Sequence, residues 1–202
     1  MNCFRYIHIL LVLLYPNLVL AQSSDAASDA ASDVRELMKS RDQKIKQLLD
    51  NEGTNNSVNQ RDELKDIVNG IIDFNEMAKT ALEVTYDTIS VEERIEFVQL
   101  FSSIIRDQSL ANLEIYRATV SYEKIEGTKD SVYVETLAEW DNVRTPVHYI
   151  LSRSSGEWKI EDMSIDDIFT AESYNRQFQR IIRSRGFDYL MSTLRKRAGR
   201  NS

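Results

Sequence analysis

The spacing of apolar residues changes twice along this chain. Between 34 and 116 apolar residues recur three or four positions apart, which predicts amphipathic helices, and between 118 and 160 they alternate with polar residues, which predicts strands. After 170 the helical spacing returns. Helices are expected at 34–49, 64–72, 74–82, 91–116, 171–184 and 187–197, and strands at 118–122, 132–140, 147–151 and 158–160. This order indicates one domain of the α+β class.

The connections between the strands favour an antiparallel sheet. Residues 127–129, 141–144 and 154–156 are short stretches rich in glycine, serine, aspartate and asparagine. Such turns join neighbouring antiparallel strands. We therefore expect a meander of four strands, or a slightly larger sheet, with the helices packed on its apolar face.

Two helix starts carry capping residues. Asp73 is followed three positions later by Glu76, and Ser90 by Glu93, which is the spacing of a capping box. The helix after Ser90 carries a band of apolar residues wider than one packing stripe requires. Two explanations stay open: a helix buried on several sides, or a helix with one flank lining an apolar cavity.

The first residues have the pattern of a secretory signal. An apolar run begins at Ile7 and ends at Val19-Leu20-Ala21, so we expect cleavage after Ala21. A retained membrane anchor is the alternative, but Pro16 and Asn17 interrupt a run that is already short for a span. We expect a signal peptide at 1–21, a flexible leader of small and acidic residues at 22–33, a folded domain at 34–198 and a tail at 199–202.

The chain has few of the residue types and motifs that enzymes use for catalysis. Cleavage would leave 181 residues (202 − 21) without cysteine and with His148 as the one histidine, which excludes a thiolate nucleophile and a two-histidine metal site. The sequence also has no glycine-rich phosphate loop and no G-x-S-x-G motif. We expect no enzyme, no catalytic residue, no metal and no cofactor, and a structural role for His148 on the strand face opposite Val147 and Tyr149.

The charge balance also restricts the partners. A net charge of −7 disfavours nucleic acid, because a phosphate backbone repels an acidic chain. One group of cations, Arg195-Lys196-Arg197 with Arg200, stands against this balance. It fits either a helix end that complements the helix dipole or a patch for a lipid surface.

Several short sequence motifs follow one another between about Ile67 and Leu194, in an order typical of one protein family. It comprises Asp73-Phe74 with Met77, Ser90 with Glu92, Phe97 and Phe101, Pro146-Val147, Trp158-Lys159-Ile160-x-Asp162, Phe178, and Gly186-Phe187. In this order and spacing the chain resembles the MlaC family of periplasmic phospholipid-binding proteins. The resemblance implies that the sheet and the helices enclose an apolar cleft.

The resemblance also implies a function. Members of this family are soluble periplasmic carriers that shield phospholipid acyl chains and move lipid between an outer-membrane lipoprotein complex and an inner-membrane ABC transporter with an MCE-domain protein, so that outer-membrane lipid asymmetry is maintained. A monomer is expected. The side chains expected to line the cleft are Phe74, Met77, Phe97, Phe101, Ile104, Ile105, Val134, Val147, Tyr149 and Leu151.

The chain departs from the family pattern at several positions. Glu83 and Asp167 stand where the family has glycine, and Tyr86 stands where it has tryptophan. Val91, Ser109 and Phe169 differ as well. The loop before the long helix and the turn after the last strand are therefore expected to differ from other members.

Two other classes of function stay open. One is an enzyme resembling the nuclear-transport-factor-2-like group, which would use a buried carboxylate or Tyr149 as a base. The other is a structural adaptor of the envelope whose apolar sheet face is filled by its own side chains.

Overall fold

The elements follow the predicted order of helices, strands and helices. The computed structural model describes residues 17–50, 58–109, 113–153 and 156–199. The helices are α1 (Asn17–Asp50), α2 (Val58–Asn69), α3 (Phe74–Leu82), α4 (Val84–Thr88), α5 (Val91–Ser109), the 3-10 helix η1 (Leu113–Arg117), α6 (Thr170–Arg185) and α7 (Phe187–Ala198). The strands are β1 (Thr119–Gly127), β2 (Ser131–Trp140), β3 (Val143–Ser152), β4 (Lys159–Ile165) and β5 (Ile168–Phe169).

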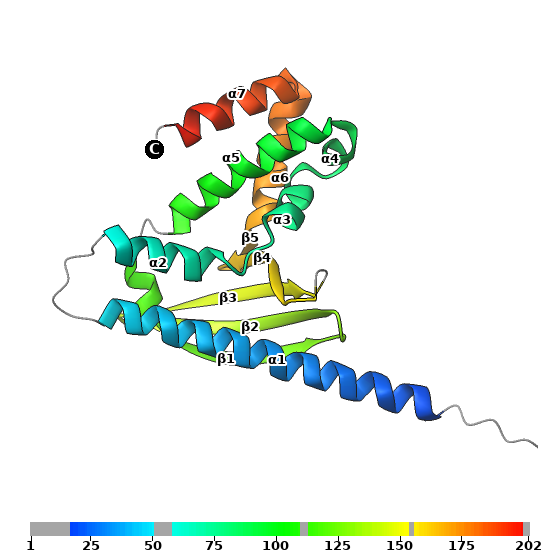
Figure 1. Ribbon diagram of the computed structural model, residues 1–202, viewed down its shortest axis with the longest axis vertical. Helices are drawn as coiled ribbons and strands as arrows, with labels where there is room; N and C mark the ends of the chain where they lie inside the picture. The colour runs from blue at the N-terminus through cyan, green and yellow to red at the C-terminus, as the bar shows by residue number, and fades with distance from the viewer. Residues whose placement is uncertain (1–16, 51–57, 110–112, 154–155, 200–202) are drawn as a thin grey trace, which may run out of the picture.

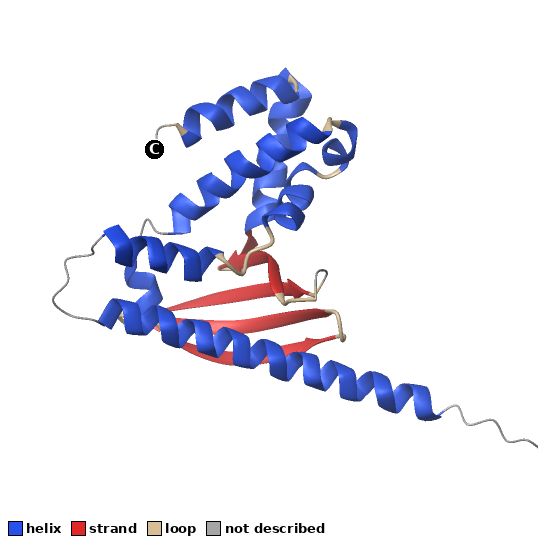
Figure 2. Ribbon diagram, viewed as in Figure 1, coloured by secondary structure: helices blue, strands red, loops and turns tan. Residues whose placement is uncertain are grey.

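The five strands form one antiparallel sheet in the order of the chain, β1-β2-β3-β4-β5 (Figures 1 and 2). This confirms the α+β class and the meander, to which the short β5 adds a fifth strand. The expected helix over 91–116 was too long, since α5 ends at Ser109 and η1 follows at Leu113. The Tyr116 hydroxyl donates to the Ser109 carbonyl oxygen at 2.7 Å and so satisfies one of the carbonyls left free where the helix ends.

Two of the hairpin turns have the same backbone form. Asp141 and Asn142 join β2 to β3, and Asp166 and Asp167 join β4 to β5; all four have positive φ, between 49° and 63°. Two consecutive residues of positive φ in a two-residue loop make the type I′ turn, which suits the twist of paired strands. Aspartate and asparagine tolerate this conformation better than other residues with a side chain. Asp167 can therefore replace the family's glycine.

Helix α1 crosses one face of the sheet (Figure 1). Its buried residues Ala30, Val34 and Met38 lie four positions apart and pack against the buried side chains of the strands. We call this group the sheet cluster; its other buried members are Ile71, Val132, Val134, Leu151, Trp158 and Ile160.

The prediction of a flexible leader at 22–33 was wrong, because these residues belong to α1. Ala30 is buried against the sheet, and Asp33 accepts a hydrogen bond from Arg153 at 2.6 Å. Alanine has the highest helix propensity of any residue, and its small side chain lets the helix approach the strands closely. The alternation of small and acidic residues is therefore the pattern of a helix, with alanine on the side facing the sheet.

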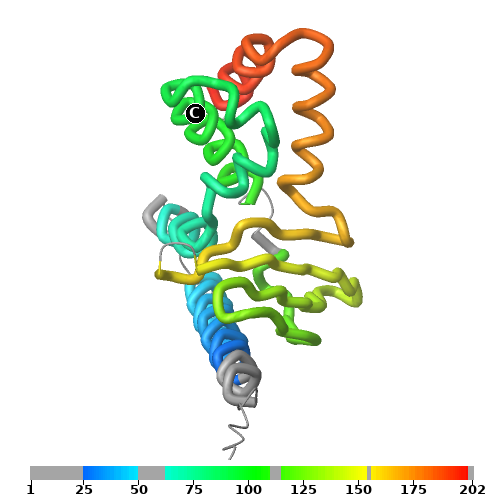
Figure 3. The backbone as a smooth tube through the Cα atoms, turned by 90° about the vertical axis from the view of Figure 1, so that its right-hand side faces the viewer, coloured from blue at the N-terminus to red at the C-terminus, as the bar shows by residue number. Residues whose placement is uncertain are grey.

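Helices α3, α4, α5, α6 and α7 form a separate layer beyond the β4 edge of the sheet, whereas α2 and η1 lie beside α1 (Figures 1 and 3). Buried residues of α3, α5, α6 and α7 make a second apolar group, which we call the helical cluster. Ile72 is partly buried and packs against both clusters. A single helix, α1, therefore packs on the apolar sheet face, while most of the others pack on one another.

Candidate functional site

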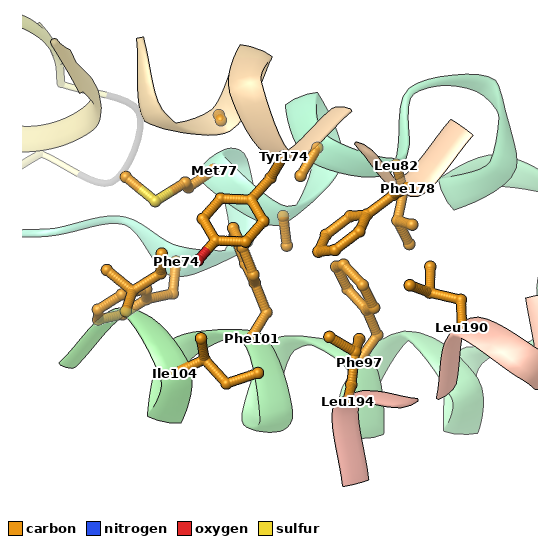
Figure 4. Packing of buried hydrophobic residues seen from close by; sticks show 14 of the residues in the cluster. Phe74, Met77, Leu82, Phe97, Phe101, Ile104, Tyr174, Phe178, Leu190 and Leu194 are labelled. Carbon is orange, nitrogen blue, oxygen red and sulfur yellow. The ribbon is translucent and has the colours of Figure 1, made fainter. Parts of the chain in front are cut away.

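The helical cluster holds six of the ten residues expected to line the cleft. These are Phe74, Met77, Phe97, Phe101, Ile104 and Ile105. Phe97 and Phe101 stack with ring centroids 5.6 Å apart, and the Phe178 ring meets both edge-on, at 5.7 Å and 5.8 Å (Figure 4). Met77, Phe97, Phe101 and Ile104 have 0% of their surface exposed, so their immediate surroundings are filled by the protein's own side chains.

The other four expected residues lie on the strands. Val134 and Leu151 belong to the sheet cluster and are fully buried, and Tyr149 is half-buried against it. Val147 is half-buried, and it pairs with Thr136 on one side and with Ile165 on the other. The structure therefore divides the ten residues between two cores and does not gather them in one place.

The apolar sheet face is covered at one end and open at the other. The register places Trp140, Val143, Val147, Tyr149, Met163 and Ile165 on the same face as the sheet cluster, toward the type I′ turns. Val147, Tyr149 and Met163 are half-buried, whereas Trp140, Val143 and Ile165 are 43%, 62% and 44% exposed. We call these six residues the open apolar face. Thr136, Ala138 and Thr145 lie among them on the same face. Exposed apolar residues that share one face mark binding surfaces in many proteins.

Arg41 adds a buried charge at the border of this face. Its guanidinium donates to the carbonyl oxygens of Ile67 and Val68, at 2.9 Å for Val68, near the C-terminal end of α2. Burial lowers the pKa of Arg41, and the electrostatic effect of Tyr149 is the largest of those that raise it. Burial also raises the pKa of Tyr116 and of Tyr122, in each case to about 12. These phenols are therefore neutral near pH 7, and the charges that act on Tyr122 are those of Asp42, Arg35 and Arg41.

Sequence analysis missed Arg41, although a signal was present. It occupies the position three residues after Met38 and four before Ile45, on the stripe that α1 buries. A cation on an otherwise apolar stripe needs partners when it is buried. The two carbonyl oxygens of α2 provide them.

The two candidate bases of the enzyme alternative have other roles. Asp162 is the buried carboxylate, and its Oδ1 accepts from the backbone N–H groups of Met163 at 2.8 Å and Ala171 at 3.0 Å. It thereby caps the start of α6 from β4. Burial raises the pKa of Tyr149, the reverse of what a base near neutral pH requires.

His148 lies on the opposite face of the sheet, as expected, and is hydrogen-bonded. Its Nδ1 is 3.0 Å from the Tyr133 hydroxyl and 3.5 Å from an oxygen of Asp167. The side chain is 17% exposed, whereas that of Asp167 is 79% exposed. The contacts join β2, β3 and the β4–β5 turn, which is a structural role.

Other types of site were sought over the same residues. Among the described residues no three histidine, cysteine, aspartate or glutamate side chains come together as a metal site would require. Within the described part of the chain, no helix has both the length and the apolar character to cross a bilayer. A shallow hollow of about 450 Å³ on the β1–β2 hairpin is lined by Glu126, Gly127, Thr128, Ser131 and Tyr133, and includes none of the ten expected residues.

Comparisons with known proteins agree with this architecture. The family model described as "MlaC protein" matches residues 38–196. A solved structure of the phospholipid-binding protein from Ralstonia solanacearum, in complex with a phospholipid, is similar with a TM-score of 0.70 over 85% of this chain and 98% of that chain. The two sequences are 19% identical, so this likeness establishes the fold. No curated protein sequence matches the chain.

Proposed function

The chain belongs to the MlaC family, and we propose that it is a periplasmic carrier that binds one phospholipid by covering its acyl chains. The observation that carries this proposal is the open apolar face, which continues the sheet cluster and keeps three exposed apolar side chains, Trp140, Val143 and Ile165. The phospholipid held by the structurally similar Ralstonia protein supports the choice of ligand.

The energetics explain why such a carrier needs apolar surface above all. Two acyl chains of about 16 carbons each, at about 0.8 kcal/mol per buried methylene, cost on the order of 20 kcal/mol to leave in water. The headgroup is well solvated and can stay outside. A site lined almost entirely by aliphatic and aromatic side chains is therefore sufficient. The six residues of the open apolar face are of this kind.

We place the acyl chains against Val147 and Tyr149, the two of the ten expected residues that retain partial exposure on the open apolar face. Val134 and Leu151 are buried in the sheet cluster, which borders this face, whereas the other six belong to the helical cluster and lie away from it. Arg41 interacts electrostatically with Tyr149 and so lies at the border of this apolar surface.

The family also motivates the wider role that we propose. The signal peptide at 1–21 would deliver the chain to the periplasm, where it would act as a monomer. There it would carry lipid between an outer-membrane lipoprotein complex and an inner-membrane MCE-domain/ABC transporter, and so maintain outer-membrane lipid asymmetry.

Lipid content is the direct test. Protein purified from a membrane-containing host is expected to carry phospholipid in native mass spectrometry. Val147→Glu places a charge among the acyl chains and is expected to reduce the bound fraction by at least about tenfold, because an unpaired carboxylate in an apolar environment costs several kcal/mol.

Leu137→Glu is the matched control. Leu137 is also half-buried in a central strand, but it lies on the face opposite Val147. This variant is expected to keep its phospholipid, and circular dichroism checks that both variants fold. Equal lipid content in Val147→Glu and the wild type, or wild-type protein without phospholipid, would refute the proposal.

A further inference from the structure

The C-terminal helix pair is basic in an acidic chain. Residues 170–198, which form α6, Gly186 and α7, contain seven arginines and lysines and two carboxylates, a net charge of +5. The whole chain carries −7, so the remainder carries −12 (−7 − 5). Such an asymmetry orients a protein toward an anionic surface that would repel the rest of it.

Three of these cations form a stripe on α6. Arg176, Arg180 and Arg183 are spaced by four and three residues, so they lie on one side of the helix, and all three are exposed. The buried residues Ala171, Tyr174 and Phe178 lie on the other side. Figure 3 shows α6 at the outer edge of the helical layer. Because its buried side faces that layer, the exposed stripe lies on the side away from it.

The stripe is largely free to meet a ligand. Arg176 pairs with Glu172 at 2.6 Å, but the side chains of Arg180 and Arg183 make no ion pair or hydrogen bond with any residue that the structure describes. A guanidinium matches a phosphodiester, because it can donate two parallel hydrogen bonds to two oxygens.

The character of α6 favours a membrane surface over a protein partner. A specific protein interface has an apolar centre from which charges are depleted. No large apolar side chain of α6, all of which is described, is exposed. The exposed Tyr189, in the first turn of α7, stacks with Arg185 at 4.6 Å, and tyrosine is a residue typical of the bilayer interface.

We propose that the outer face of α6 docks this protein on bilayers that carry anionic headgroups. This goes beyond the proposed function, because it adds a contact with the bilayer itself to the exchange of lipid with the two membrane complexes. Attraction works through the accumulated charge of several exposed cations and needs no pocket.

Vesicle sedimentation tests this inference. Purified protein is expected to bind vesicles of phosphatidylcholine mixed with phosphatidylglycerol at low salt, and to bind phosphatidylcholine alone weakly. Arg180→Glu with Arg183→Glu is expected to lower the affinity for the anionic vesicles by at least about tenfold, since each cation near such a surface contributes roughly fivefold.

Lys39→Glu with Lys44→Glu is the control, because it changes the net charge equally at exposed positions of α1. It is expected to retain most of the binding. Equal loss in both double variants would show a general charge effect and overturn the proposal. Wild-type protein that binds anionic and neutral vesicles equally would also overturn it and would direct attention to an acidic protein partner.

Phospholipid content separates this proposal from the proposed function. The α6 double variant is expected to keep its phospholipid in native mass spectrometry while it loses vesicle binding. Wild-type protein that binds anionic vesicles but carries no phospholipid would refute the carrier and leave the docking surface standing.

Discussion

Glu83 joins α3 to α4 in a backbone conformation that only glycine adopts readily. Its φ is 53° and its ψ is −134°, outside the regions open to residues with a Cβ atom. The carboxylate compensates weakly, through one contact of 3.4 Å with the Asn175 side chain. The family's glycine at this position is thus explained by the backbone, and this chain has retained the turn at an energetic cost.

Glu83→Gly is therefore expected to stabilise the protein. The gain is about 1 kcal/mol, because relief of the strain exceeds the greater chain entropy of glycine in the unfolded state. For a domain of this size it corresponds to a rise in Tm of roughly 2–4 °C in calorimetry. Glu83→Ala also removes the Asn175 contact but keeps the strain, so its Tm should not rise; an equal rise in both variants would contradict the explanation.

At the scale of elements, local pattern predicted the strands well and the first helix poorly. Val132, Val134 and Thr136 alternate with less buried residues because one face of β2 meets α1, and that alternation is visible in the sequence. The helix over 22–33 was missed because its contact with the sheet is made by alanine, which carries little hydrophobic signal. The end of α5 was misplaced because the Tyr116 bond to Ser109 is a contact between two elements.

A charge at Ala30 tests whether this part of α1 is packed. Ala30→Glu is expected to lower the free energy of unfolding by about 3 kcal/mol in urea titration, since it places a carboxylate against the apolar face of the sheet. Ser28→Glu, at an exposed position of the same helix, is expected to change it by less than about 0.5 kcal/mol. If both variants were as stable as the wild type, residues 22–33 would be a leader after all.

At the scale of the molecule, the division into two cores could not be predicted. Periodicity shows which side of an element is buried, but not which element covers it. Phe97 and Val134 are both buried positions by pattern, yet they lie in different clusters. Eight of the ten residues expected to line the cleft are buried, but they are divided between the two clusters by tertiary pairing, which periodicity does not show.

Asp162 ties the sheet to the helical layer, and its ionisation should be visible in the stability of the whole protein. Burial raises the pKa of this carboxyl above its usual range, although hydrogen bonds from backbone N–H groups at the start of α6 act to lower it. The folded state then holds a proton that the unfolded chain has already lost. From the ordinary aspartate pKa of about 3.9 up to the raised value, stability is expected to fall as pH rises.

Asp162→Asn removes this titration and keeps an acceptor oxygen for Ala171. The free energy of unfolding of the wild type minus that of the variant, measured in urea between about pH 4 and pH 7, is expected to decrease with rising pH. Other carboxylates contribute equally to both proteins and cancel. A difference that is constant or rises with pH would show that the backbone donors outweigh burial.

The separation of the two clusters also limits which substitutions in this sequence can compensate for one another. A loss of volume at Phe97 can be compensated by a larger neighbour such as Phe178, whose ring it meets, but not by Leu151 in the other cluster. We accordingly expect compensating substitutions to occur within one cluster or the other. Ile72, which contacts both, is the position where the two sets of exchanges constrain each other.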